Sequence, residues 1–163
     1  MNRLTRMCAG LVLVLCVGGA LPAATADSQT TARRLTQKTG IKGGLVVHVG
    51  CDRGRLAAAL GERDNFIVHG LDASAADIKE ARTYIESNGL YGRVSVQQWS
   101  GNRLPYADNL VNLLVVEEKS GLPREEMMRV LAPGGYLCMP KQDTWVSLKK
   151  PRPDKIGQWS HYL

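Results

Sequence analysis

The sequence LVVHVGCDRG, residues 45–54, decides the fold class of this chain. Residues 45–49 form an apolar, β-branched run, which predicts a strand buried on both faces. Gly50 and Gly54 follow, and the run RLAAAL at residues 55–60 predicts a helix. A buried strand that turns through glycines into a helix is the first half of a βαβ unit. The loop amides and the helix N-terminus of such a unit can face a carboxylate or a phosphate.

The rest of the chain continues the alternation of strand and helix patterns. Apolar runs predict four further strands, and the capping-box pair Ser74 and Asp77 marks the start of the clearest helix. Strands and helices in alternation predict an α/β domain with a Rossmann-like, doubly wound, mostly parallel sheet. The further strands are expected at residues 66–71, 94–96, 110–116 and 136–139, and further helices at 31–38, 74–87 and 123–131.

The first 26 residues have the layout of a secretory signal peptide. Arg3 and Arg6 precede an apolar run at residues 8–21, and the small residues at 24–26 offer a cleavage site. The run is shorter than the roughly 20 apolar residues of a membrane-spanning helix. We therefore expect an exported protein, periplasmic or secreted, with no stable membrane anchor after signal cleavage. An uncleaved anchor and a buried core helix are the alternatives.

The net charge of +6 does not come from the predicted domain. Residues 43–140 hold ten Lys or Arg and twelve Asp or Glu, so the basic excess lies in the N-terminal segment and the C-terminal tail. A nucleic-acid-binding domain gathers basic side chains on one face, so no nucleic-acid partner is expected. The expected division is a signal peptide at 1–26, an N-terminal helix and linker at 27–42, the main domain at 43–148 and a proline-rich tail at 149–163.

Two cysteines remain after signal cleavage, Cys51 and Cys138. They belong to the first and fifth predicted strands, with the fourth strand between them. Neighbouring strands lie about 4.8 Å apart, so two strands with a third between them lie nearly 10 Å apart. A disulfide requires Cα atoms within about 7 Å. We therefore expect two free thiols.

Asp72 stands at the carboxyl end of the second predicted strand, 22 residues after Gly50. In doubly wound folds, a carboxylate at this place accepts hydrogen bonds from the ribose of a bound nucleoside. A dinucleotide fingerprint would need glycine where the chain has Asp52 and Arg55, which disfavours an NAD-linked oxidoreductase. The alternative role of Asp72 is to cap the turn into the next helix, although Ser74 is placed to cap that helix itself.

Two further strings carry a family resemblance. LPYADN at residues 104–109 precedes the fourth predicted strand, and RVLAPGG at residues 129–135 leads into the fifth. Together with the glycine turn and Asp72, they resemble the class I S-adenosylmethionine-dependent methyltransferase domain, of the type 11-like group, over residues 43–140. The resemblance implies the class I methyltransferase fold, S-adenosylmethionine as cofactor, and transfer of a methyl group to an unidentified acceptor.

The resemblance also implies a set of cofactor-binding residues. Gly50 and Gly54 match the loop around the methionine part of the cofactor, Asp72 matches the ribose-binding acid, and Ser100 matches a position that contacts adenine. Trp99 is expected either to stack on adenine or to belong to the core. The full set is His48, Gly50, Cys51, Asp52, Gly54, Asp72, Ala73, Trp99 and Ser100.

Two residues depart from the family pattern. His48 stands where the family usually keeps an acidic residue that helps to hold the ammonium group of the cofactor, and Asp52 replaces the middle glycine of the loop. One interpretation is that Asp52 supplies the missing carboxylate, because aspartate tolerates left-handed backbone. The other is that cofactor affinity is lost, and that the domain is a catalytically degenerate binding or scaffold module of a secreted multidomain protein. No catalytic residue and no metal ligand is assigned, and Glu117 and Glu118 are either candidates for a base or solvated loop charges.

The C-terminal part is shorter than the resemblance implies. Members of this fold finish with a helix and an antiparallel pair of strands, whereas residues 144–148 predict one strand. We therefore expect the C-terminal strands to be incomplete. Residues 150–163 resemble the junction between a methyltransferase-like domain and a PQQ-type β-propeller in large secreted bacterial proteins. Either the chain is a fragment, or a partner or missing domain covers the open sheet edge.

Overall fold

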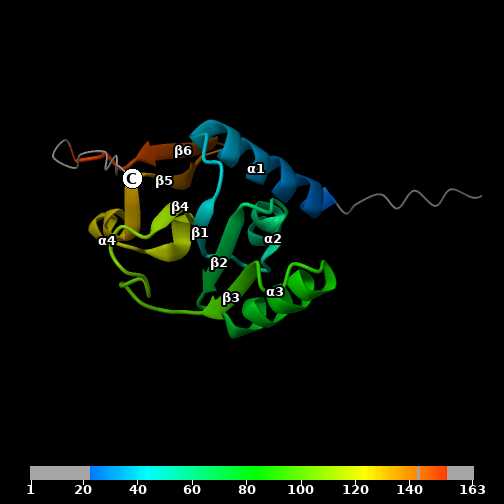
Figure 1. Cartoon of the computed structure of the whole chain (residues 1–163). Coiled ribbons are helices and arrows are strands. Elements are labelled where there is room, and N and C mark those ends of the chain that lie inside the picture. Colours follow the sequence, from blue (N-terminus) through cyan, green and yellow to red (C-terminus); the bar gives the residue numbers. More distant parts are fainter. Residues whose placement is uncertain (1–22, 143, 154–163) are drawn as a thin grey trace, which may run out of the picture.

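A six-stranded sheet forms the centre of the molecule (Figure 1). The computed structural model describes residues 23–142 and 144–153. The strand order is β3-β2-β1-β4-β5-β6, and neighbouring strands are parallel except for β5 and β6. The predicted doubly wound, mostly parallel sheet is therefore confirmed. The strands are β1 (Gly44–Val49), β2 (Phe66–Asp72), β3 (Val94–Gln98), β4 (Val111–Val116), β5 (Leu131–Lys141) and β6 (Thr144–Lys149).

Within the described residues, helices cover both faces of the sheet (Figure 1): α1, α2 and α3 pack on one face and α4 packs on the other. Alternate residues of each central strand enter two separate cores: Val46 and Leu113 pack on the three-helix side, and Val47 and Leu114 on the α4 side. Burial on both faces explains why these strands read as continuous apolar runs. Each such side chain contributes about 1.5–3 kcal/mol when it leaves water. The helices are α1 (Ala23–Thr39), α2 (Arg55–Gly61) and α3 (Ala75–Ser87) on the first face, and α4 (Arg124–Val130) on the second.

The strand order creates a switch point between β1 and β4. β1 leads through α2 to β2 on one side, whereas β4 leads through α4 to β5 on the other. In open α/β sheets, ligands bind outside the carboxyl ends of the strands at such a point, because the loops diverge there and leave a crevice. The loops after β1, β2 and β4 are therefore the place to look for a site.

α1 begins at Ala23, earlier than the predicted start at residue 31. No glycine or proline lies between residues 23 and 39 to stop the helix. Gln29 in the extended part donates a hydrogen bond of 2.9 Å to Glu62, just after α2. Tertiary contact therefore lengthens a helix whose own sequence pattern is weak.

β5 is also longer than predicted, because it begins at Leu131 instead of Tyr136. Pro133-Gly134-Gly135 was expected to form the turn out of the helix, yet these residues lie within the strand. At Gly135, an added Cβ would lie about 3 Å from the carbonyl oxygens of Val111, Asn112 and Ala132. The absence of a side chain there lets β5 pack tightly on the irregular start of β4, where the pairing register shifts.

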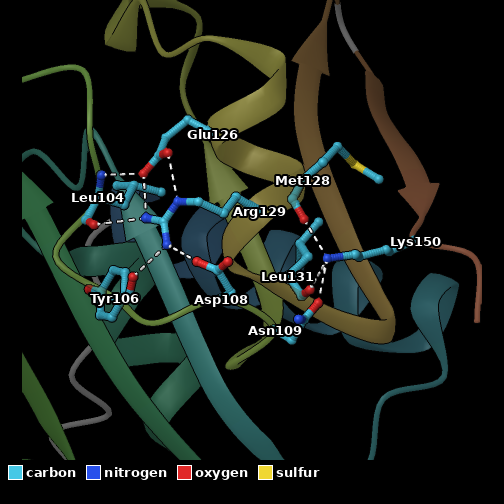
Figure 2. Close-up of polar contacts among 9 residues, drawn as sticks. All are labelled: Leu104, Tyr106, Asp108, Asn109, Glu126, Met128, Arg129, Leu131 and Lys150. Carbon is cyan, nitrogen blue, oxygen red and sulfur yellow. Dashed lines mark hydrogen bonds and ion pairs between the residues drawn. The ribbon is translucent and has the colours of Figure 1, made fainter.

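β6 is the single C-terminal strand that the sequence predicts, and it pairs antiparallel with β5. Figure 2 shows how its end is held: the Lys150 ammonium lies among the carbonyl groups at the end of α4. It donates to Met128 O at 2.6 Å, to Leu131 O at 2.7 Å and to Asn109 Oδ1 at 2.7 Å. These bonds satisfy carbonyls that the end of a helix leaves without intrahelical partners.

The predicted signal peptide falls mainly on residues 1–22, which lie outside the described residues, and it stays a prediction. Ala23–Ala26 form the first turn of α1. Within the described ranges, 23–142 and 144–153, no helix has the length and apolar character to cross a membrane. Cys51 and Cys138 are both buried and free, so the predicted pair of free thiols is confirmed.

Candidate functional site

The turn after β1 is a tight stretch of mostly left-handed backbone that is hydrogen-bonded to β2. Gly50, Asp52 and Gly54 all have positive φ, at 77°, 46° and 73°. The amides of Gly50 and Cys51 both donate to Leu71 O, at 2.8 and 3.1 Å. The turn is thereby fixed beside the carboxyl end of β2, where Asp72 stands.

The Asp72 carboxylate faces this turn. Its Oδ2 accepts a hydrogen bond of 2.9 Å from the Asp52 amide, and its Oδ1 accepts one of 2.9 Å from the Ser74 amide. The capping role is therefore real as well, although Ser74 caps α3 through its own side chain. A carboxylate oxygen has two lone pairs, so each oxygen retains one acceptor position for a ligand hydroxyl.

Close packing explains the two glycines of the turn. A Cβ on Gly50 would lie 2.9 Å from Glu117 Cβ, and a Cβ on Gly54 would lie 2.8 Å from Ala81 Cβ. Both distances are shorter than real side chains allow. The absence of side chains therefore lets the turn pack against Glu117 and α3 in its left-handed conformation.

Cys51 is buried next to this turn, and its thiol is not poised for reaction. Burial and the charge of Asp72 raise the pKa of Cys51 to about 12. The neutral thiol packs instead against β2, where its Sγ would lie 2.9 Å from a Cβ on Gly70. The Cys51 side chain thus packs between the turn and β2, and only the Cys51 backbone could contact a ligand.

The remaining predicted residues lie near Asp72. The Trp99 amide donates to Asp72 O at 2.7 Å, which brings the loop after β3 to the end of β2. The Trp99 ring is partly buried against the core on the α4 side, as its core interpretation expects. Ala73 and Ser100 are exposed at the same edge of the sheet. The structure therefore brings the whole predicted set to one end of the sheet; which of its members contact a ligand stays a prediction.

His48 and Glu117 form a pair that the sequence analysis did not predict. His48 is 2% exposed at the end of β1, and its Nε2 lies 3.4 Å from Glu117 Oε1 after β4. The His48 Nδ1 is buried and has no hydrogen-bond partner among the described residues. An orphaned buried nitrogen costs about 1–3 kcal/mol, and such a cost in a native protein calls for an explanation.

A pocket of about 300 Å³ opens at the carboxyl ends of β4 and β5. Its apolar lining includes Leu122, Met127 and Met139, and Glu117 and Glu118 stand in the same wall. Glu117 therefore lies between this pocket and the turn after β1. Small-molecule sites are typically apolar clefts with a few polar groups, which fits this pocket.

A cluster centred on Arg129 positions the loop that precedes β4 (Figure 2). The Arg129 guanidinium forms a paired contact with Glu126, with N–O distances of 2.6 and 2.8 Å, and binds Asp108 at 2.6 Å. It also donates to the carbonyls of Leu104 and Tyr106. The LPYADN and RVLAPGG strings are thus joined physically, because the arginine of the second holds the first in place.

This cluster predicts a stability that depends on pH. The hydrogen bonds from Arg129 hold the pKa of the Glu126 carboxyl below its ordinary value of 4.5. A depressed pKa contributes stability above pH 4.5, and that contribution disappears as the pH falls through the folded-state value. Glu126→Gln should therefore cost about 1–2 kcal/mol at pH 7, and progressively less as the pH is lowered from 4.5 toward 2.

Chemical denaturation of the wild type and the variant across this pH range measures the effect. Glu125→Gln, at an exposed position one residue earlier, is the matched control and should change stability little at either end. An equal cost of Glu126→Gln at pH 7 and pH 2 would contradict the role given to the ionised pair.

No group of three or more His, Cys, Asp or Glu side chains in the described part of the chain is arranged to hold a metal ion.

Comparison with known proteins points to one family. Residues 46–135 match the family model described as a methyltransferase domain. The chain is similar to the methyltransferase GfsG of Streptomyces halstedii, with 32% identity over 124 residues that cover 72% of this chain and 45% of that protein. It spans about half the length of the curated relatives that it matches.

Solved structures show the same fold. A putative S-adenosyl-L-methionine-dependent methyltransferase from Methanococcus maripaludis superposes with a TM-score of 0.65 at 23% identity, covering 72% of this chain and 57% of that one. A geranyl diphosphate C-methyltransferase from Streptomyces coelicolor, solved with S-adenosyl-L-homocysteine, gives a TM-score of 0.60 at 20% identity, covering 68% and 44%. At these identities the likeness establishes the fold alone.

Proposed function

The chain belongs to the methyltransferase domain family, and from this premise we propose that it binds S-adenosylmethionine beside the turn after β1. We further propose that the methyl group is transferred to an acceptor held in the pocket at the ends of β4 and β5. The acceptor is not identified by any residue of the site.

The observation that carries this proposal is the orientation of Asp72 toward the Gly50–Gly54 turn. A nucleoside cofactor needs a hydrogen-bond acceptor for its ribose hydroxyls and an open stretch of backbone beside it. The Asp72 carboxylate supplies the first, with one acceptor position left on each oxygen. The turn supplies the second, because Asp52 and Arg53 at its centre are exposed. The residues present therefore fit the cofactor.

The residues of the chain have mainly positioning roles in this proposal. S-adenosylmethionine, when bound, supplies a methyl group activated by a positively charged sulfur. Asp72 would hold the ribose, the backbone of the turn would contact the methionine part, and Trp99 and Ser100 would contact the base. The neighbouring pocket, lined by Leu122, Met127 and Met139, would contact the apolar part of the acceptor. Alignment of two reactants supplies much of the rate in such a transfer.

Export and a longer parent protein remain proposals that rest on sequence alone. Residues 1–26 support cleavage and export, and residues 150–163 support a junction to a further domain such as a β-propeller. N-terminal sequencing of the protein recovered from the producing cells tests the first of these, since the mature chain should begin after Ala26.

Isothermal titration calorimetry with S-adenosylmethionine, S-adenosylhomocysteine and NADH tests the proposed function. We expect dissociation constants in the micromolar range for the first two ligands and no measurable binding of NADH. Absence of binding to both adenosyl ligands at millimolar concentration would instead support the scaffold interpretation. Binding of NADH alone would support the oxidoreductase interpretation.

A further inference from the structure

Asp72 and Glu117 occupy matching positions on the two sides of the glycine turn. In the sheet register, Val49 at the end of β1 pairs with Leu71 of β2 and with Val116 of β4. Asp72 and Glu117 are the residues that follow these two partners, so they flank Gly50 at the same level of the sheet edge. Their backbones lie about two strand spacings apart, on the order of 10 Å.

The Glu117 side chain is built into the turn. Its amide donates to Val49 O at 3.0 Å, which joins the loop after β4 to the end of β1. Its Cβ would be 2.9 Å from a Cβ on Gly50, so the stem of the side chain packs directly on the turn. Glu117 is therefore fixed beside the turn, unlike its exposed neighbour Glu118.

The buried His48 orients the Glu117 carboxylate. The imidazole Nε2 lies 3.4 Å from Glu117 Oε1. A carboxylate oxygen accepts, so in this contact the His48 Nε2–H donates to Glu117. Nδ1 is buried without a donor among the described residues. The Glu117 side chain is 35% exposed, so its carboxylate is accessible to a ligand while it contacts the buried His48.

The other carboxylates at the turn are less suited to bind a cation. Both oxygens of Asp72 already accept backbone amide hydrogen bonds, and Asp72 lies on the ribose side. Asp52 has the left-handed backbone expected for it, with φ at 46°, but its side chain is exposed, so Asp52 is the second candidate. Only Glu117 combines a fixed stem, a buried orienting partner and an accessible carboxylate.

We propose that Glu117, oriented by His48, binds the α-ammonium group of the cofactor's methionine part. This inference rests on the proposed function, since it assigns a subsite within that same site. The cofactor ends in an amino acid whose ammonium is best bound by an ionised carboxylate. With the ribose on Asp72, the methionine part is long enough to cross the Gly50 turn and reach Glu117. The carboxylate that holds the ammonium thus comes from the end of β4, while β1 contributes the histidine that orients it.

Two ligands that differ in the whole amino-acid end, which carries this ammonium group, test the inference. S-adenosylhomocysteine carries the amino acid, whereas 5′-methylthioadenosine keeps the ribose and the thioether but lacks it. By calorimetry, Glu117→Gln should weaken binding of S-adenosylhomocysteine at least tenfold and change binding of methylthioadenosine less than twofold. Glu125→Gln, which makes the same charge change at an exposed position of α4 outside the site, should leave both affinities unchanged.

Binding of methylthioadenosine also reports that the variant is folded. An equal loss of affinity for both ligands in Glu117→Gln, or no loss for either, would overturn the inference. So would a selective loss of S-adenosylhomocysteine binding in Asp52→Asn with none in Glu117→Gln. If the wild type binds neither ligand, the proposed function fails and this inference fails with it; the other outcomes leave the proposed function standing.

Discussion

Asp72→Asn should weaken binding of S-adenosylhomocysteine by 100-fold or more. The carboxylate is expected to accept two ribose hydroxyl groups while it also accepts the Asp52 and Ser74 amides. Hydrogen bonds to a charged group contribute about 1.5–3 kcal/mol each, and a 100-fold loss corresponds to about 2.7 kcal/mol. In asparagine, the side-chain NH₂ group also faces one of these backbone N–H donors. The backbone therefore loses one of its two hydrogen bonds to this side chain.

Calorimetry on the wild type and the variant measures this loss. Asp64→Asn is the matched control, because Asp64 is an exposed aspartate whose partner is Arg93 at 2.8 Å, away from the turn. Circular dichroism at the titration temperature shows whether Asp72→Asn is folded. A folded variant that binds S-adenosylhomocysteine within threefold of the wild type would remove Asp72 from the site.

Gly54→Ala should destabilise the chain by about 2–5 kcal/mol. At φ 73° an L-residue costs about 1–2 kcal/mol in the left-handed region. The new Cβ would also lie 2.8 Å from Ala81 Cβ, in the face of α3 that packs on α2. Overpacking of this kind typically costs a further 1–3 kcal/mol. Urea denaturation gives the difference in the free energy of unfolding.

Gly89→Ala is the control for the backbone part of this effect. Gly89 has a similar φ of 67°, and an added Cβ there would meet no atom within 4 Å. Gly89→Ala should therefore lower the free energy of unfolding only by the cost of the left-handed backbone, about 1–2 kcal/mol. Ala81→Gly alone should cost about 1 kcal/mol, because glycine disfavours a helix interior; in that background Gly54→Ala should cost less than in the wild type, because the atom that the new Cβ meets is gone. If Gly54→Ala and Gly89→Ala cost the same, tight packing is not what requires glycine at position 54.

The main features of the fold could be predicted because they depend on local sequence. The run at residues 45–49 is apolar at every position, and the observed strand is buried on both faces. Ser74 and Asp77 mark the start of α3, and the structure shows Ser74 as its cap. The turn with Asp72 beside it could also be predicted, since both follow the carboxyl ends of adjacent parallel strands.

The features that were missed depend on contacts between distant segments. The doubly wound order predicts that the fourth strand lies beside the first, but the contact between His48 and Glu117 also depends on the side-chain packing at the end of the two strands, which no local pattern of either residue indicates. The long β5 depends on Gly135, whose missing side chain admits backbone atoms of β4. The local sequence of the RVLAPGG string does not distinguish a glycine in a turn from a glycine in a tightly packed strand. The early start of β5 could therefore not be predicted.

A crystal structure of the chain with S-adenosylhomocysteine tests the central claim most directly. The account predicts the ribose hydroxyls within hydrogen-bond distance of the Asp72 carboxylate, and the homocysteine part along the backbone from Gly50 to Gly54. Ligand density at another place on the molecule, with the Asp72 carboxylate bound only to the Asp52 and Ser74 amides, would contradict it.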